Sequence, residues 1–209
     1  MNIEISEKSV VDTAIEITKI NGENYFKISN SNVMRPFFMS IVSDSNHWMF
    51  ISSNGGLTAG RKNSDFALFP YYTDDKITES SEFTGSKSIF LVTQYDKSQL
   101  WEPFSDRYDG MYQTTRNLYK NKYGNKVLFE EVNHDLNLTF RYELKSSNIY
   151  GFIKESTLIN HNELPTQIAL IDGLQNILPY GVGSDLQNQS SNLVDAYKRS
   201  ELEEKTGLG

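Results

Sequence analysis

The amino-acid sequence predicts an all-β fold, a large antiparallel β-sandwich. Three observations predict it. Apolar and polar side chains mostly alternate with a period of two, turn residues recur at short intervals, and the long helical stretches that join parallel strands are missing. The 12 Tyr and 12 Phe residues favour strands. A length of 209 residues suits one domain, so we expect residues 1–209 to form a single β-sandwich domain.

The best-defined local feature is a hairpin near the N-terminus. Residues 15–20 largely alternate apolar and polar side chains, Asn21-Gly22 follows, and residues 25–28 continue the pattern. Asn-Gly between two such runs is the strongest short-range hairpin signal in a sequence. Further strands are expected over residues 37–42, 48–51, 66–69, 88–94, 126–133, 136–144, 150–160 and 167–171.

The C-terminal segment has a different pattern. Residues 191–205 are typical of a short helix, with Ser190 or Ser191 as its N-cap and Gly207 at its end. We therefore expect residues 190–209 to form a helix or linker that leads into further sequence of a larger protein.

Composition and charge exclude several function classes. The net charge of -7 argues against nucleic-acid binding, and the only dense basic stretch, Lys120, Lys122 and Lys126, is typical of a solvated turn. The absence of Cys excludes a disulfide scaffold, a thiolate zinc site and a Cys nucleophile. No apolar run has the length of a membrane span, and no signal peptide is recognisable, so we expect no membrane contact and a cytoplasmic location.

The titratable residues predict no catalytic centre. His47, His134 and His161 share no metal-ligand spacing, and each lies beside a turn or a strand end. Glu130 and Glu131 are neighbours on a predicted strand and therefore point to opposite faces, so they cannot form a local acid–base pair. We expect no catalytic residue, no metal site and no cofactor.

The glycine-rich run Asn54-Gly55-Gly56 is interpreted as a tight turn. A phosphate-binding loop needs a Gly-Lys-Ser/Thr ending and a following helix, and neither is present. A tight turn needs only the positive φ that glycine adopts readily.

The most unusual stretch runs from Trp101 to Tyr112 and mixes aromatic rings, carboxylates and one Arg. Such a mixture suits sugars, because aromatic rings stack on their C–H faces while polar groups bind their hydroxyls. Trp101 and Tyr112 are the candidate stacking residues, and Arg107 and Asp109 are the candidate hydrogen-bonding residues. The alternative, which we favour, is that Trp101 is buried and anchors this loop to the sandwich.

Four segments together resemble a known family. Phe50–Gly56, Phe69–Tyr72, Trp101–Pro103 and Thr157–Ile171 occur in the order found in the N-terminal β-supersandwich of cellobiose-phosphorylase-like enzymes. That fold is shared with galactose-mutarotase-like domains. The resemblance covers roughly residues 25–180.

The resemblance implies a supporting role in a larger enzyme. In that family an (α/α)₆ barrel follows the sandwich and carries the catalytic acid and the phosphate or water site. By this resemblance the chain is the non-catalytic N-terminal domain of a carbohydrate-active enzyme, acting on a disaccharide or oligosaccharide. The sandwich would pack on the missing barrel and contribute to substrate access or to a homodimer. Leu57–Arg61 differs from the sequence that the phosphorylases usually have after Gly-Gly. Both phosphorolysis and hydrolysis therefore stay open as the reaction of the parent enzyme.

Two alternatives belong to other function classes. Asn133–Leu138 echoes a stretch of the aldose mutarotases, in which a His and a distant Glu act on the sugar ring; His134 would be that His, although the stretch also fits a hairpin turn. The second alternative is a stand-alone carbohydrate-binding module, which needs an exposed aromatic platform, with Trp101 as the best candidate.

Overall fold

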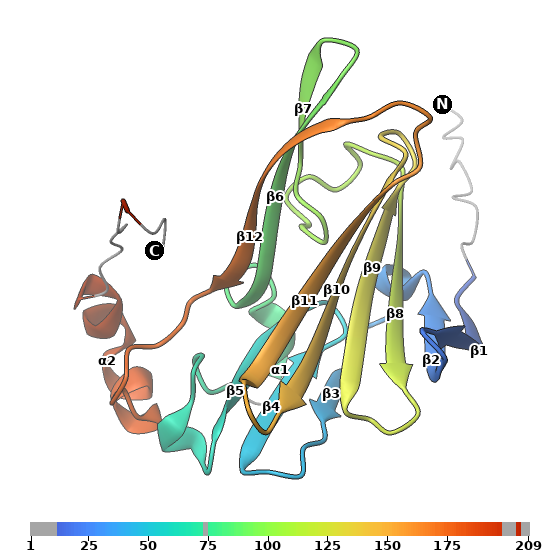
Figure 1. Cartoon of the computed structure of the whole chain (residues 1–209). Helices are drawn as coiled ribbons and strands as arrows, with labels where there is room; N and C mark the ends of the chain where they lie inside the picture. The colour runs from blue at the N-terminus through green and yellow to red at the C-terminus, as the bar shows by residue number, and fades with distance from the viewer. Residues whose placement is uncertain (1–11, 73–74, 198–203, 206–209) are drawn as a thin grey trace, which may run out of the picture.

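The computed structural model describes residues 12–72, 75–197 and 204–205. In these residues, strands form three antiparallel sheets (Figure 1). The largest sheet has the order β1 (Ala14–Ile20), β2 (Glu23–Ser29), β8 (Thr114–Asn121), β9 (Lys126–Asn133), β10 (Leu138–Ser147), β11 (Gly151–Asn160). The second has the order β12 (Gln167–Gln175), β6 (Gly85–Gln94), β7 (Lys97–Trp101), and the third has the order β3 (Phe38–Ile41), β4 (His47–Ser52), β5 (Leu57–Arg61). The helical elements are short: η1 (Ser31–Val33), η2 (Ser64–Phe66), α1 (Asp75–Glu79) and α2 (Ser184–Tyr197).

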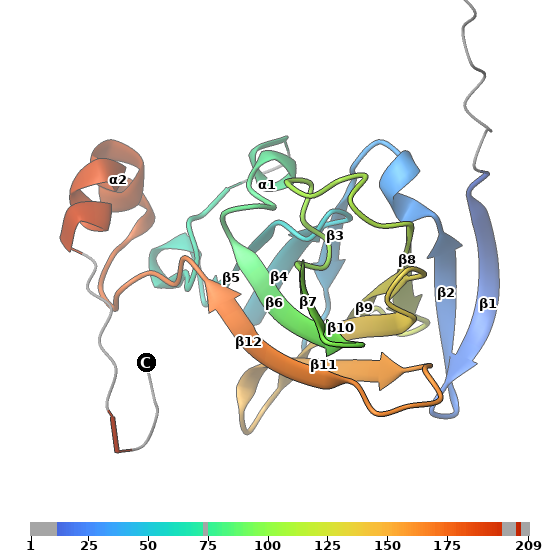
Figure 2. The same ribbon diagram turned by 90° about the horizontal axis from the view of Figure 1, so that it is seen from above.

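One hydrophobic core joins the three sheets. Phe140 of β10, Phe90 of β6 and Ile51 of β4 belong to the same cluster of buried side chains. The rings of Phe90 and Phe140 lie 5.0 Å apart, edge to face. The two small sheets therefore cover one face of the large sheet, and Figure 2 shows this arrangement from above. The predicted all-β antiparallel sandwich is confirmed.

The predicted N-terminal hairpin is confirmed in position and in turn geometry. β1 pairs with β2 from Ala14 opposite Ser29 to Ile20 opposite Glu23. Asn21 and Gly22 have φ values of 51° and 84°. Two consecutive residues with positive φ form the type of hairpin turn that Asn-Gly favours.

The strand predicted at residues 66–69 is wrong. η2 ends at Phe66, and its preceding residue Asn63 accepts a hydrogen bond from the backbone N–H of Asp65, which starts a helical turn. Beyond η2, the pairing with β5 is limited to a single bridge between Ala67 and Gly60. A short apolar run here reflects burial of Phe69 in the core rather than a strand.

The C-terminal helix begins earlier than predicted. α2 starts at Ser184, and Ser190 lies inside it at a kink, with φ −137° and ψ 34°, instead of capping its start. Asp185 in the first turn carries the negative charge that a helix N-terminus favours. Gly207, the predicted end, lies outside the described residues.

The fold brings one long connection across an end of the sandwich. β7 belongs to a small sheet and β8 to the large one, so residues 102–113, called the crossing loop below, pass from one sheet to the other (Figure 1). This loop contains most of the stretch that the sequence singled out.

Candidate functional site

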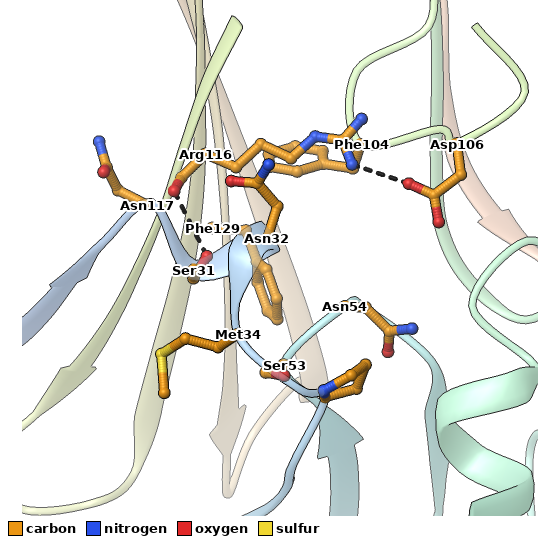
Figure 3. A pocket seen from close by; sticks show the side chains of 11 residues that line it. Ser31, Asn32, Met34, Ser53, Asn54, Phe104, Asp106, Arg116, Asn117 and Phe129 are labelled. Atoms are coloured by element: carbon orange, nitrogen blue, oxygen red, sulfur yellow. Dashed lines mark hydrogen bonds and ion pairs between the residues drawn. The ribbon is translucent and has the colours of Figure 1, made fainter. Parts of the chain in front are cut away.

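A pocket of about 130 Å³ lies where η1, the β4–β5 turn, β8 and the crossing loop meet (Figure 3). Phe129 of β9 also contributes, so five segments of the chain form its wall. Its lining residues are Ser31, Asn32, Met34, Pro36, Ser53, Asn54, Phe104, Asp106, Arg116, Asn117 and Phe129. The lining thus combines aromatic rings with amide, hydroxyl, carboxylate and guanidinium groups.

Arg116 of β8 is the best-anchored polar group of the pocket. Its Nε donates to Glu131 Oε2 at 2.8 Å, its Nη1 to Asp106 Oδ1 at 2.9 Å and its Nη2 to the carbonyl of Ser105 at 2.9 Å. Burial disfavours the charged guanidinium, but the charges of Glu131 and Asp106 outweigh this effect and raise the pKa of Arg116. Three of the five N–H groups of Arg116 are thereby engaged, and the other two donate to no group in the described part of the chain.

Glu131 holds Arg116 from the core side. Its side chain is only 2% exposed, and it also accepts hydrogen bonds from Trp101 Nε1 at 2.8 Å and from the backbone N–H of Phe104 at 2.7 Å. A buried carboxylate with this many donors is a fixed anchor. Glu131 therefore joins the large sheet, the end of β7 and the crossing loop.

Asp106, Asn32 and Phe104 present the accessible groups. The Asp106 side chain is 68% exposed and uses only Oδ1 in its bond to Arg116. Asn32 is exposed, and its side chain makes no hydrogen bond to the part of the chain that the structure describes. The half-buried ring of Phe104 is packed edge-on against Tyr142, 5.2 Å away, and lines the pocket together with Arg116.

The Asn54-Gly55-Gly56 run is a tight turn, as predicted, and Asn54 contributes to the pocket wall. Asn54 Oδ1 accepts a hydrogen bond from Ser52, and its Nδ2 donates to the carbonyl of Thr78 at 2.8 Å. Gly55 has a φ of 97°, and the carbonyl of Ile77 occupies the place of a side chain at Gly56. Gly55 is therefore required by the positive φ of the turn, and Gly56 by the close approach of the Ile77 carbonyl from α1.

Glu82 fixes the crossing loop from the other side. Its Oε1 accepts from the backbone N–H of Asp106 at 2.7 Å, and its Oε2 accepts from Lys87 at 3.2 Å. Burial works against its charge, but these hydrogen bonds more than compensate and lower the pKa of Glu82. Arg107 Nε lies 3.4 Å from Glu82 Oε2. Arg107 is a predicted site residue, and it is not among the residues that line the pocket.

The other three predicted site residues meet in a smaller hollow. Trp101, Asp109 and Tyr112 line a space of about 20 Å³, little more than the ~10–15 Å³ that one water needs. Trp101 is 1% exposed, as the anchor interpretation requires, and the hydroxyl of Tyr112 donates to the carbonyl of Leu100 at 2.7 Å. Sugar binding by Trp101, Arg107, Asp109 and Tyr112 stays a prediction.

The sequence did not predict most residues of the larger pocket, including the four on which its chemistry depends: Asn32, Phe104, Asp106 and Arg116. Phe104 and Asp106 lie within the stretch that drew attention, but nothing in the pattern separated them from their neighbours. Arg116 is hidden in a strand, and Asn32 lies about 70 positions before the crossing loop. Spatial proximity of distant segments was the missing information.

Glu130 and Glu131 lie on opposite faces of β9, as predicted. Glu130 accepts hydrogen bonds from Asn117, Tyr119 and Arg141 on the outer face of the large sheet. Burial opposes its ionisation, but these donors prevail and lower the pKa of Glu130.

The histidines are bonded to hydroxyl groups. Among these contacts, His134 Nε2 lies 2.8 Å from the Thr115 hydroxyl, and His161 Nε2 lies 2.9 Å from the Thr139 hydroxyl. No described carboxylate shares a hydrogen bond with His134. Within the described ranges, no three His, Asp or Glu side chains are grouped to hold a metal ion.

Comparisons with known proteins leave the family open. No model of a protein family matches the chain, and a search of curated proteins finds no match either. Within the described ranges, none of the helices has the length and apolar character needed to cross a membrane.

Proposed function

We propose that this chain is a non-catalytic β-sandwich module of a carbohydrate-active protein, and that it holds one sugar unit in the pocket between η1 and the crossing loop. One observation carries the proposal. The ring of Phe104 shares this pocket with Arg116, Asp106 and Asn32, which all keep hydrogen-bonding groups available.

This combination matches the chemistry of a sugar ring. A sugar presents apolar C–H groups, which suit contact with Phe104, and hydroxyls that both donate and accept hydrogen bonds. The free carboxylate oxygen of Asp106 accepts, the remaining N–H groups of Arg116 donate, and the amide of Asn32 does both. Because Glu131 already holds Arg116 in place, little side-chain entropy is lost on binding.

The size of the pocket selects a single unit. Its volume of about 130 Å³ is well below the roughly 300–1,000 Å³ of pockets for drug-sized ligands. We therefore expect a monosaccharide or the terminal unit of a longer sugar to enter.

The carboxylates beside the pocket support a binding role rather than hydrolysis. Glu131 is buried under fixed donors, and Asp106 is exposed and paired with Arg116. Glycoside hydrolysis needs two carboxyl groups that flank the bond, one of them able to give up a proton. Together with the resemblance of four segments to a phosphorylase sandwich, this favours a module that recognises sugar without cleaving it.

Calorimetric titration with glucose, cellobiose and laminaribiose tests the proposal. We expect saturable binding of at least one sugar, weakened by Asp106→Ala roughly 10-fold or more, since a hydrogen bond to a charged group contributes about 1.5–3 kcal/mol. Asn32→Ala should weaken binding by a smaller factor. The matched control is Asp109→Ala, an exposed carboxylate of the same loop outside this pocket. Absence of binding to all three sugars, or equal loss in Asp106→Ala and Asp109→Ala, overturns the proposal.

A further inference from the structure

The strand β12 is an edge strand that the sandwich barely covers. It pairs with β6 on one side only, and seven of its nine residues are exposed. Figures 1 and 2 agree that no described strand runs along its other side. A row of backbone N–H and C=O groups is therefore open for pairing.

Both faces of β12 carry exposed apolar side chains. Leu170, opposite Phe90 of the core, is 56% exposed, and Leu174 on the same face is 37% exposed. Ile171, on the opposite face, is 73% exposed. A partner packed on one face of the sheet would shield only one of these sets, whereas a strand added along the edge lies beside both.

β12 lacks the usual protection of an edge strand. Natural edges carry Lys, Pro or bulges that prevent pairing, and β12 contains no Lys, Arg or Pro. Its only charged residue, Asp172, is already bound to Ser88 and Lys154 of its own chain. By contrast β1, one of the two edge strands of the large sheet, carries Glu16 and Lys19.

We propose that β12 pairs with β12 of a second copy of this chain, antiparallel about a two-fold axis at Ile171. This register is nearly palindromic. Ile168 meets Leu174, Ala169 meets Gly173, and Gln167 meets Gln175, so most pairs join similar side chains. Only Leu170 opposite Asp172 breaks this match, and each Asp172 keeps its Lys154 as counter-charge. Such an isologous contact closes on itself as a dimer, and it goes beyond the proposed sugar binding.

Cysteine cross-linking tests the register directly, because the chain contains no Cys. Opposite residues of an antiparallel pair have Cα atoms about 4.5–5.5 Å apart, within the span of a disulfide. Ile171→Cys should therefore give a covalent dimer under mild oxidation. The matched control is Ile15→Cys on β1, which is also 73% exposed. Equal cross-linking of both variants, or none at Ile171→Cys, overturns the proposal.

Sedimentation of the full chain tests the dimer without any cross-link. One strand pair is a small interface, so we expect the dimer fraction to rise between about 1 and 200 µM. Ile171→Lys places two like charges opposite each other and should give a monomer with an unchanged melting temperature, whereas Ile15→Lys should remain dimeric. A wild type that stays monomeric over this range, or dimers of Ile171→Lys, contradicts the proposal. Sugar titration of Ile171→Lys should match the wild type, which separates this proposal from the sugar site.

Discussion

At the scale of single residues, Glu131 is the most constrained side chain near the pocket. It collects hydrogen bonds from Trp101, Phe104 and Arg116, which come from β7, the crossing loop and β8. Removing one hydrogen-bond partner leaves a buried charged group without compensation for its lost solvation. The resulting loss of stability exceeds the net contribution of the hydrogen bond itself. The position of Arg116 in the pocket therefore depends on a core residue that no ligand touches.

Trp101→Ala tests whether Trp101 is an anchor. Because the indole is buried and donates to Glu131, we expect a loss of about 3–5 kcal/mol in the free energy of unfolding, measured in urea. Tyr112→Phe, which removes only the hydroxyl that donates to the carbonyl of Leu100, should cost about 1 kcal/mol.

A loss of unfolding free energy below about 1 kcal/mol for Trp101→Ala would be close to the range of surface substitutions. Together with loss of sugar binding, it would indicate that Trp101 is an exposed platform and would contradict its burial in the structure.

At the scale of elements, the sequence predicted strands wherever the alternation was clear. β1–β4, β6 and β9–β12 were expected near their observed positions, although β9 and β12 were expected from apolar runs without clear alternation. β8 was missed because Arg116 faces the core side, where Glu131 neutralises it, so a charged residue occupies an apolar position of the pattern. β7 was missed because four of its five residues are not buried and its sequence is mostly polar.

β8, β9 and β10 are further linked by Glu130, and this link predicts acid sensitivity. The pKa of Glu130 is lowered in the folded state, so its ionised form stabilises the fold fully above its unfolded pKa, about 4.3. This contribution is lost as the pH falls below that value through the folded pKa. We expect Glu130→Gln to be less stable than the wild type at pH 7 and to show a flatter decline of unfolding free energy between about pH 5 and pH 3.

Urea unfolding at several pH values measures this dependence. Glu79→Gln, on the exposed side of α1, is the matched control and should follow the wild type. Parallel pH profiles of Glu130→Gln and the wild type would show that Glu130 does not contribute the predicted stability.

At the scale of the whole molecule, the candidate site is a product of topology. The pocket unites Asn32, Asn54, the crossing loop and Arg116, and these segments meet only because the chain passes between sheets at one end of the sandwich. A period-two pattern predicts that a sandwich forms but not which strands are neighbours. The sequence therefore indicated the crossing loop as unusual while leaving its partners η1 and β8 unidentified.

The proposed function is that one sugar unit binds in that pocket and is not transformed there. The most direct test is a ¹H–¹⁵N NMR titration of the full chain with the sugar that binds best in calorimetry, while the sugar's own signals are followed. We predict shifts concentrated at Asn32, Phe104, Asp106 and Arg116, with the sugar chemically unchanged. Shifts centred on Asp109 and Tyr112, no shifts at all, or conversion of the sugar would contradict the claim.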